Sequence, residues 1–438
     1  MSEIIPLLIC FEAYLSSTRL RQLKHLVFAM LCIPNQATML GLSRWTEKGG
    51  SYRTLQRFYQ SQIDWVQLHW QIIKTHLISG EGLYLLAGDD VAVSKSGKQT
   101  HGVGRFYSGL AQRVIPSLSF LAISLIDVKA RRSYPLQIGQ HQPKSRPKQV
   151  IEKPKRKRGR PKGSKNHVKA APILTPELNL LVRILSEILT RLGLLCLKHI
   201  VLDGKFGNYP STWAVRQTGL HIISKMRQDA ALYFPYKGLK PARGATPRYG
   251  EKVNYANLPT DTLFESRIEG DYYIETYQMS VFHKDYPDAL NVVIIVKTHL
   301  KTGKRGHIVL FSTDLNLSAA QMVDYYSLRF QIEFNFRDAK QYWGLEDFMN
   351  IRPTAVSNAV NLSFLMVNLS IALLKPYRQD NPAFSIRDLK AQFQARRYLD
   401  ETIKMLPNPP NEHLISHIWR KLTRFGSIRT RQIERPAA

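Results

Sequence analysis

The sequence contains little cysteine, few acidic residues and no convincing membrane-spanning or targeting segment. Its three cysteines, Cys10, Cys32 and Cys196, lie far apart and form no CxxC pair. They suggest neither a disulfide framework nor a zinc module, and they fit a reducing cytoplasm. The apolar run at residues 359–374 is shorter than the roughly 20 residues that span a bilayer, so it predicts a buried core helix. Residues 4–10 are apolar but follow no basic segment and precede no cleavage-like site.

Acidic residues are greatly outnumbered by basic ones. The chain has 62 Lys and Arg against 33 Asp and Glu, so its formal net charge is +29. These charges repel one another unless a polyanion neutralises them, which predicts a nucleic-acid partner. A basic ribosome-associated or membrane-surface protein is the alternative. Apolar residues make up 44% of the 438 residues, which excludes a wholly disordered chain. The length predicts roughly two to four structural units.

Much of the positive charge lies in one segment, residues 144–169. It holds twelve Lys and Arg and one acid, so it carries +11 of the total +29. The segment is rich in Pro and Gly and nearly free of large apolar side chains, which predicts a flexible loop. Residues 158–161 (RGRP) resemble the core of an AT-hook, with Arg158, Arg160 and Lys162 as the DNA-binding side chains. A run that binds phosphates without base preference is the alternative.

The spacing of apolar residues changes along the chain. Residues 1–78 show helical spacing and carry basic side chains, which predicts a small helical DNA-binding domain. A helical core with a basic solvent-facing side is the alternative. Residues 230–316 are rich in Tyr, Val, Ile and Thr and predict a β-rich insertion. We expect strands over 83–90, 116–127, 199–203, 220–225, 272–282 and 290–298, and helices over 176–195, 210–218, 317–342 and 359–374, with Thr175 and Ser318 as N-caps.

Three acidic residues follow short apolar runs that are typical of buried strands. Asp89 and Asp90 follow the run that begins at Leu83, and Asp203 follows the run that begins at His199. Charged side chains rarely lie beside a core unless they are paired or bind a metal, so neighbouring strands could bring these acids into one site. The alternative is that each is a turn or cap residue.

A further acid lies on the predicted helix over residues 317–342. Tyr326, Arg329, Glu333 and Lys340 are separated by three, four and seven residues, so they share one helical face. From the spacing alone, a solvent-facing row with an Arg–Glu ion pair is the simpler interpretation.

These four residues also carry a resemblance to a known family. Their pattern resembles the Y-R-E-K signature of bacterial insertion-sequence DDE transposases, of the insertion-sequence-four-like group with a β-strand insertion before the catalytic glutamate. Residues 89–91 (DDV) and 95–98 (KSGK) resemble the family's first-aspartate segment, with Val in place of the usual Thr. Residues 201–204 (VLDG) resemble its second-aspartate strand, and residues 43–58 its N-terminal domain. The resemblance covers about residues 40–370.

The resemblance implies an α/β protein with a ribonuclease H-like core, in which helices flank a mixed sheet. It implies that Asp90, Asp203 and Glu333 are the catalytic carboxylates and hold two Mg²⁺ ions, which Mn²⁺ can replace, with Asp89 as the alternative to Asp90. No small-molecule cofactor is expected. The resemblance assigns the other signature residues to DNA phosphates near the cleavage site: Tyr326, Arg329 and Lys340.

We therefore predict a cytoplasmic, nucleoid-associated DNA transposase. It would bind double-stranded DNA, both the terminal inverted repeats and the target, and would cut and join strands. We expect it to act as a dimer in a synaptic complex, and we expect no membrane partner. Two alternatives stay open: an architectural DNA-binding protein that has lost cleavage, and a ribonuclease H-like nuclease that cuts without joining. The predicted divisions are a helical DNA-end-binding domain (1–78), the first part of the core with the basic segment (79–229), the β-strand insertion (230–316), the glutamate helix and end of the core (317–375), and a basic C-terminal region (376–438).

Overall fold

A twelve-stranded sheet forms the centre of the computed structural model, and helices flank it. The structure describes residues 3–46, 49–79, 82–108, 112–143, 171–193, 196–241, 244–408 and 410–425. The predicted fold class, a mixed sheet flanked by helices, is therefore confirmed. The AT-hook-like residues Arg158, Arg160 and Lys162 lie outside the described residues.

Among the described residues, helices come before the first strand and after the last one, and a few helices separate strands in the middle. Both predicted N-caps are confirmed, because the Thr175 and Ser318 side chains accept the backbone N–H groups of Leu178 and Gln321. The helices are α1 (Ile5–Leu8), α2 (Ser17–Cys32), α3 (Met39–Trp45), α4 (Tyr52–Tyr59), α5 (Trp65–Ile72), α6 (Pro176–Arg191), α7 (Tyr209–Arg216), α8 (Ala319–Leu328), α9 (Gln331–Tyr342), α10 (Pro353–Asp380), α11 (Ile386–Met405) and α12 (Glu412–Phe425), with shorter helical turns η1 (Ile9–Phe11), η2 (Ile73–Leu77), η3 (Gly204–Phe206) and η4 (Thr260–Thr262).

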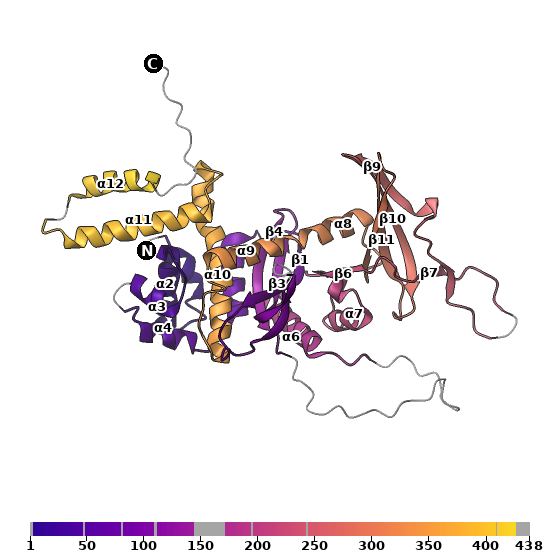
Figure 1. Cartoon of the computed structure of the whole chain (residues 1–438), viewed down its shortest axis with the longest axis horizontal. Helices are drawn as coiled ribbons and strands as arrows, with labels where there is room; N and C mark the ends of the chain where they lie inside the picture. The colour runs from indigo at the N-terminus through magenta and orange to yellow at the C-terminus, as the bar shows by residue number, and fades with distance from the viewer. Residues whose placement is uncertain are drawn as a thin grey trace, which may run out of the picture.

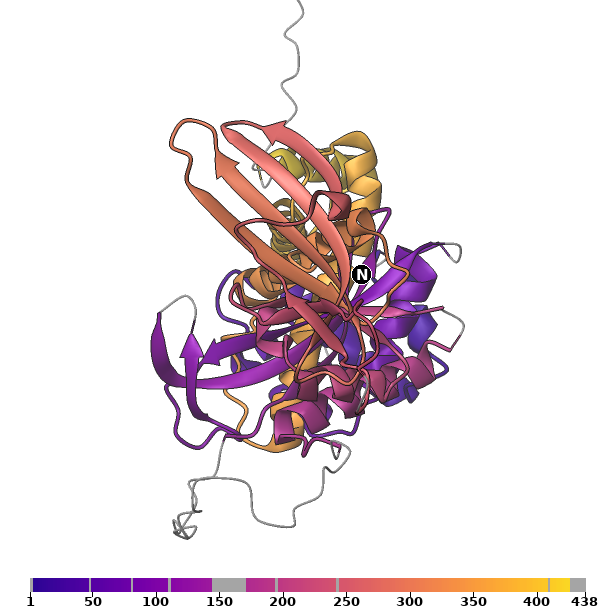
Figure 2. The same ribbon diagram turned by 90° about the vertical axis from the view of Figure 1, so that its right-hand side faces the viewer.

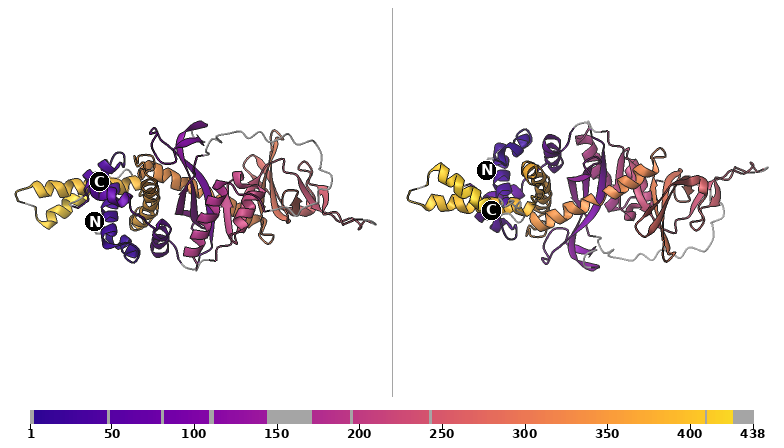
Figure 3. Two further views of the ribbon diagram at one scale, coloured as in Figure 1. Left: turned by 90° about the horizontal axis from the view of Figure 1, so that it is seen from below. Right: turned by 90° about the horizontal axis from the view of Figure 1, so that it is seen from above.

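The six predicted strands are all present, together with strands that were not predicted, and those within residues 230–316 confirm a β-rich region. They are β1 (Tyr84–Ser94), β2 (Gly104–Ser108), β3 (Arg113–Asp127), β4 (Arg132–Gln140), β5 (His199–Leu202), β6 (His221–Met226), β7 (Leu232–Pro235), β8 (Tyr249–Lys252), β9 (Leu263–Glu269), β10 (Tyr272–His283), β11 (Leu290–His299) and β12 (Arg305–Ser312). The molecule is elongated (Figure 1): α2–α4 and α11–α12 lie at one end, and β9–β11 lie at the other. Figure 3 shows the same arrangement from below and above.

The middle of the sheet is built on parallel strands. β1 pairs in parallel with β5, with Gly88 beside Leu202, and β5 pairs in parallel with β6. Parallel neighbours need crossover connections, which α6 and α7 provide. β3 lies antiparallel on the other side of β1, and β12 lies antiparallel beside β6. The sheet therefore continues without interruption from the core into residues 230–316, whose strands twist away from the rest in Figure 2.

Side-chain alternation along β1 divides the core into two layers. Leu85 and Ala87 pack in one layer with α8 and the start of α9, including Leu328 and Ile332. Leu86 packs in the other layer, which contains apolar residues of α5, α6 and α10. In the first half of β1, the alternation therefore places Leu85 and Ala87 on the α8 face and Leu86 on the α6 face, whereas Val91 and Val93, farther along, pack in the same cluster as Leu86.

The prediction of one continuous helix over residues 317–342 is wrong at its middle. The chain forms α8 and α9 with an interruption at Arg329 and Phe330, where backbone bonds tighten to a spacing of three residues. The Glu333 N–H, for example, donates to the Phe330 carbonyl at 3.1 Å. Such tightening rotates α9 relative to a regular continuation of α8. The interruption coincides with the contact of Arg329 on β1 that is described below.

The position of the acids on the strands is partly as predicted. Asp203 directly follows β5, but Asp89 and Asp90 lie inside β1, which continues to Ser94. The strand can continue because β3 pairs with it along its whole length, while β5 pairs with it only as far as Gly88.

The predicted core helix over residues 359–374 is confirmed as part of α10. Among the described residues, α10 is the one helix long and apolar enough to cross a membrane, and 89% of its most apolar window is buried inside the protein. Its Asn358 side chain joins it to the N-terminal helices by accepting from Trp65 Nε1 and donating to the Tyr59 and Ser61 carbonyls. α6 ends at Arg191, earlier than predicted.

Candidate active site

Asp89 and Asp203 lie next to each other at the point where β5 ends. The parallel register pairs Ala87 with Val201 and Gly88 with Leu202, so the next positions along both strands are Asp89 and Asp203. Ala87 and Val201 pack in the α8-side layer, and the alternation places the two aspartates on that same face. The Ser224 hydroxyl donates to the Asp203 carbonyl at 2.9 Å, which fixes the chain where β5 ends.

The interruption between α8 and α9 places Arg329 directly on this pair of acids. Arg329 Nη1 donates to Asp89 Oδ2 at 2.5 Å, and Arg329 Nη2 lies 3.7 Å from Glu333 Oε1. One guanidinium therefore links the first aspartate to the glutamate. Arg329 and Asp89 are largely buried, whereas 45% of the Glu333 side chain is exposed. The glutamate thus lies at the open side of the group.

The charges of this group strongly affect one another. Burial raises the pKa of the Asp89 carboxyl to about 6; Arg329 opposes this rise, and Asp203 and Asp90 add to it. Burial alone would lower the pKa of Arg329, but Asp89, Asp203 and other nearby acidic groups raise it above its ordinary value. The guanidinium is therefore the cation that holds these carboxylates together.

The other two signature residues of the helices lie on the same side of the sheet. Burial raises the pKa of Tyr326, and Arg329, Asp203 and Asp89 all act on its hydroxyl, so it lies close to them. Lys340 Nζ donates to the Ala92 carbonyl of β1 at 2.8 Å and lies 3.1 Å from Glu346 Oε1. The four residues therefore come from two helices rather than from the single helix that was predicted.

Asp90 belongs to a different group, on the α6 face of the sheet. Its Oδ1 lies 2.8 Å from His141 Nε2, and Lys205 Nζ donates to its Oδ2 at 2.5 Å and also contacts Glu177. Burial alone would raise the pKa of Asp90, but the hydrogen bond and charge of His141 and the charge of Lys205 lower it below its ordinary value. Neighbouring residues of a strand point in opposite directions, so Asp89 and Asp90 cannot both face Glu333.

The sequence interpretation missed His141, Glu177 and Lys205. Lys205 carried a weak signal, because it lies two residues after Asp203. His141 precedes the basic segment, Glu177 follows it, and neither gave a pattern of its own. Only the pairing of β1, β3 and β4 and the start of α6 bring them to Asp90.

Two sets of side chains could hold a metal ion. Asp89, Asp203 and Glu333 offer only carboxylate oxygens, the ligands that Mg²⁺ prefers. Asp90, His141 and Glu177 each place one ligand atom within 4.8 Å of the others, but Lys205 donates to both of their carboxylates. By ligand type the first set suits a hard divalent cation, whereas only the second, among the described residues, has its ligand atoms within 4.8 Å of one another. Each set already contains a cationic side chain, Arg329 in the first and Lys205 in the second.

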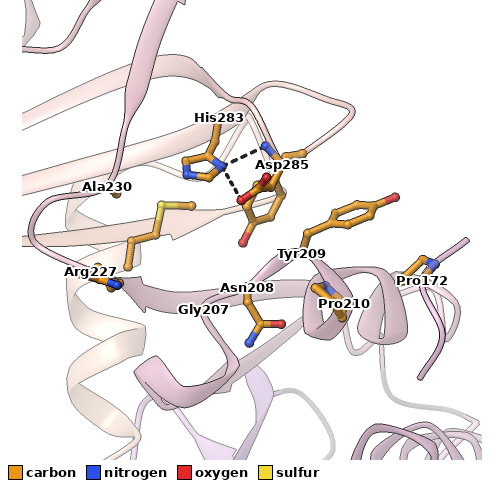
Figure 4. Close-up of a pocket in the computed structure, with 11 residues that line it drawn as sticks. Pro172, Gly207, Asn208, Tyr209, Pro210, Arg227, Ala230, His283 and Asp285 are labelled. Carbon is orange, nitrogen blue, oxygen red and sulfur yellow. Dashed lines mark hydrogen bonds and ion pairs between the residues drawn. The ribbon is translucent and has the colours of Figure 1, made fainter. Parts of the chain in front are cut away.

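A pocket of about 600 Å³ lies between the start of α7 and the turn that follows β10 (Figure 4). The Tyr209 and Tyr286 rings meet there with centroids 5.7 Å apart, and His283 Nδ1 lies 3.7 Å from Asp285 Oδ2. Neither the carboxylates around Arg329 nor those around Lys205 line this pocket. It is therefore separate from both charged groups.

Comparison with protein families gives two matches. A family model described as DDE superfamily endonuclease matches residues 10–267, more than half of the chain. A second model, described as transposase DDE domain, matches residues 175–369. The first match contains Asp89 and Asp203, and the second contains Asp203 and Glu333. No curated protein matches the chain.

Proposed function

Because the chain belongs to the DDE superfamily of endonucleases, we propose that it is the DNA transposase of an insertion sequence, of the group that carries the Y-R-E-K signature. The observation that carries the proposal is the contact of Arg329 with both Asp89 and Glu333. An Arg–Glu pair that only faced solvent would not require an acidic residue on the strand under the helix. Here the helix is interrupted where its arginine reaches the strand that carries the first acid.

The proposed catalytic carboxylates are Asp89, Asp203 and Glu333, with Asp89 in place of Asp90. The α8 face holds Asp89 and Arg329, whereas Asp90 is occupied by His141 and Lys205 on the opposite face. Three carboxylates without a nitrogen or sulfur ligand fit Mg²⁺, or Mn²⁺ in its place. When bound, such ions supply charge stabilisation for the attacking and leaving oxygens of phosphoryl transfer.

The basic signature residues are proposed to hold the DNA strand beside these carboxylates. The planar guanidinium of Arg329 can donate two parallel bonds to phosphate oxygens, which suits a position between two acids. Lys340 lies farther along β1, where it contacts the Ala92 carbonyl, and would add a point charge for a neighbouring phosphate. The Tyr326 hydroxyl, close to Arg329, would donate to the same strand.

The remaining basic surface is proposed to bind the terminal inverted repeats and the target duplex, and the protein to act as a dimer in a synaptic complex. The net charge of +29 supports this role. We assign recognition of the DNA ends to the helical domain of residues 1–78 and minor-groove contacts to Arg158, Arg160 and Lys162. The chain divisions given above and the nucleoid-associated location belong to the same proposal.

One experiment separates this proposal from its alternatives. Purified protein is incubated with a labelled duplex that carries the flanking inverted repeat, with Mg²⁺ or with EDTA, and compared with Asp203→Ala and Glu333→Ala. We expect Mg²⁺-dependent nicking and joining by the wild type, and DNA binding without either step by both variants. Binding without nicking by the wild type would instead favour an architectural protein, and nicking without joining would favour a nuclease.

A further inference from the structure

A second group of charges joins four elements on the α6 face of the sheet. Asp90 comes from β1, His141 follows β4, Glu177 lies in the first turn of α6, and Lys205 lies in η3 directly after β5. Lys205 Nζ contacts both Asp90 Oδ2 and Glu177 Oε1, and His141 Nε2 lies 2.8 Å from Asp90 Oδ1. We call these four residues the rear cluster.

The rear cluster is tied to both strands that carry the proposed catalytic aspartates. Asp90 is the neighbour of Asp89, and the Asp90 N–H donates to Asp89 Oδ1 at 2.8 Å. Lys205 follows Asp203 by two residues. Direct pairing of β1 with β5 stops at Gly88 and Leu202, one position before the two aspartates. Beyond that point, the Asp90–Lys205 contact links β1 to the segment that follows β5.

The arrangement of ligand atoms in the rear cluster suits a cation. One atom from each of Asp90, His141 and Glu177 lies within 4.8 Å of the others, and the Lys205 ammonium donates to both carboxylates. His141 and Asp90 are mostly buried, with side-chain exposures of 9% and 24%. Without the ammonium, the carboxylates of Asp90 and Glu177 would repel each other at close range.

We propose that Lys205 is the resident cation of the rear cluster, and that its contact with Asp90 positions Asp89 and Asp203 for metal binding on the opposite face. This inference rests on the proposed function, because it gives Lys205 a positioning role for those carboxylates. Asp90 then holds the metal site in place from the opposite face of the sheet and is not one of the metal ligands. Groups that orient the ligands of a metal act in this way, and their loss typically lowers metal affinity or activity about 10- to 100-fold.

The test compares Lys205→Met, Lys205→Arg, Asp90→Asn and the double variant Lys205→Met/Asp90→Asn with the full-length wild type. Lys198→Met is the matched control, because Lys198 is an exposed lysine immediately before the other end of β5. Three quantities are measured: Mn²⁺ affinity by calorimetry without DNA, the rate of Mg²⁺-dependent nicking at saturating DNA against Mg²⁺ concentration, and DNA affinity against salt concentration.

We expect Lys205→Met to weaken Mn²⁺ binding and to raise the half-saturating Mg²⁺ concentration about 10- to 100-fold, with DNA affinity unchanged. Lys205→Arg should recover most of this loss, and Lys198→Met should behave as the wild type. Asp90→Asn and the double variant should be no worse than Lys205→Met, because residues that act through one contact do not add their effects.

Wild-type metal affinity in Lys205→Met would overturn the inference. So would a Lys205→Met variant that loses DNA affinity and salt dependence while its metal affinity is unchanged, because that result would make Lys205 a phosphate-binding residue. A wild type that binds Mn²⁺ but never nicks DNA would refute the proposed function alone. In that case the calorimetric comparison would still decide the role of Lys205.

Discussion

The two adjacent aspartates of β1 should respond very differently to the same substitution. Asp89→Asn removes a carboxylate from the group that contains Arg329 and Glu333, whereas Asp90→Asn changes the opposite face. Both changes preserve side-chain size and differ from the wild type mainly in charge. The pair therefore tests which acid is the proposed metal ligand, with each variant as the control for the other.

The expected magnitudes follow from these positions. Loss of a direct metal ligand should remove several kcal/mol of transition-state stabilisation, and a loss of about 4 kcal/mol corresponds to a roughly 10³-fold slower reaction. Asp90→Asn acts only through the rear cluster and should slow nicking about 10- to 100-fold. The loss of folding stability should rank the two variants in the opposite order, with the larger loss in Asp90→Asn. Burial raises the pKa of Asp89, so its charge opposes folding, whereas the lowered pKa of Asp90 shows that its charge favours folding.

The assay is Mg²⁺-dependent nicking of the inverted-repeat duplex, accompanied by thermal unfolding of each variant. We expect Asp89→Asn to unfold no lower than the wild type but to be nearly inactive. Asp90→Asn should unfold at a lower temperature but retain more activity. Activity that survives in Asp89→Asn and is lost in Asp90→Asn would refute the assignment of the two faces.

Two further predictions concern the folded core rather than the chemistry. His69 is fully buried beside Asn368, and burial lowers its pKa to about 3, so the free energy of unfolding should fall by about 1.6 kcal/mol between pH 6.5 and pH 5 as the unfolded state takes up a proton. Urea unfolding at several pH values should show a flatter pH dependence for His69→Gln, and equal slopes for the variant and the wild type would contradict this origin. Asn358→Ala should lower the free energy of unfolding by about 3 kcal/mol, because the Trp65 N–H and the Tyr59 carbonyl lose their buried partner. If urea unfolding shows a change below about 1 kcal/mol, water replaces the Asn358 amide in the variant.

Local patterns were sufficient for most of the secondary structure. Thr175 and Ser318 were recognisable as N-caps because capping depends on a few neighbouring residues. The apolar run at 359–374 predicted a buried helix because its composition allows little else. The interruption at Arg329 could not be predicted in this way. The residues around it have ordinary helical spacing, and the contact that accompanies it lies 240 residues away at Asp89.

The sequence by itself determined the chemistry available to this protein: an excess of positive charge, a few acids beside apolar strands, and a helically spaced set of Tyr326, Arg329, Glu333 and Lys340. The strand pattern alone could not distinguish Asp89 from Asp90, because both follow the same apolar run, and the family resemblance favoured Asp90. Only the tertiary structure decided which acid shares a face with Glu333. The physical reason is that neighbouring side chains of a strand point to opposite faces, and only the packing of α8 and α6 shows what each face contains.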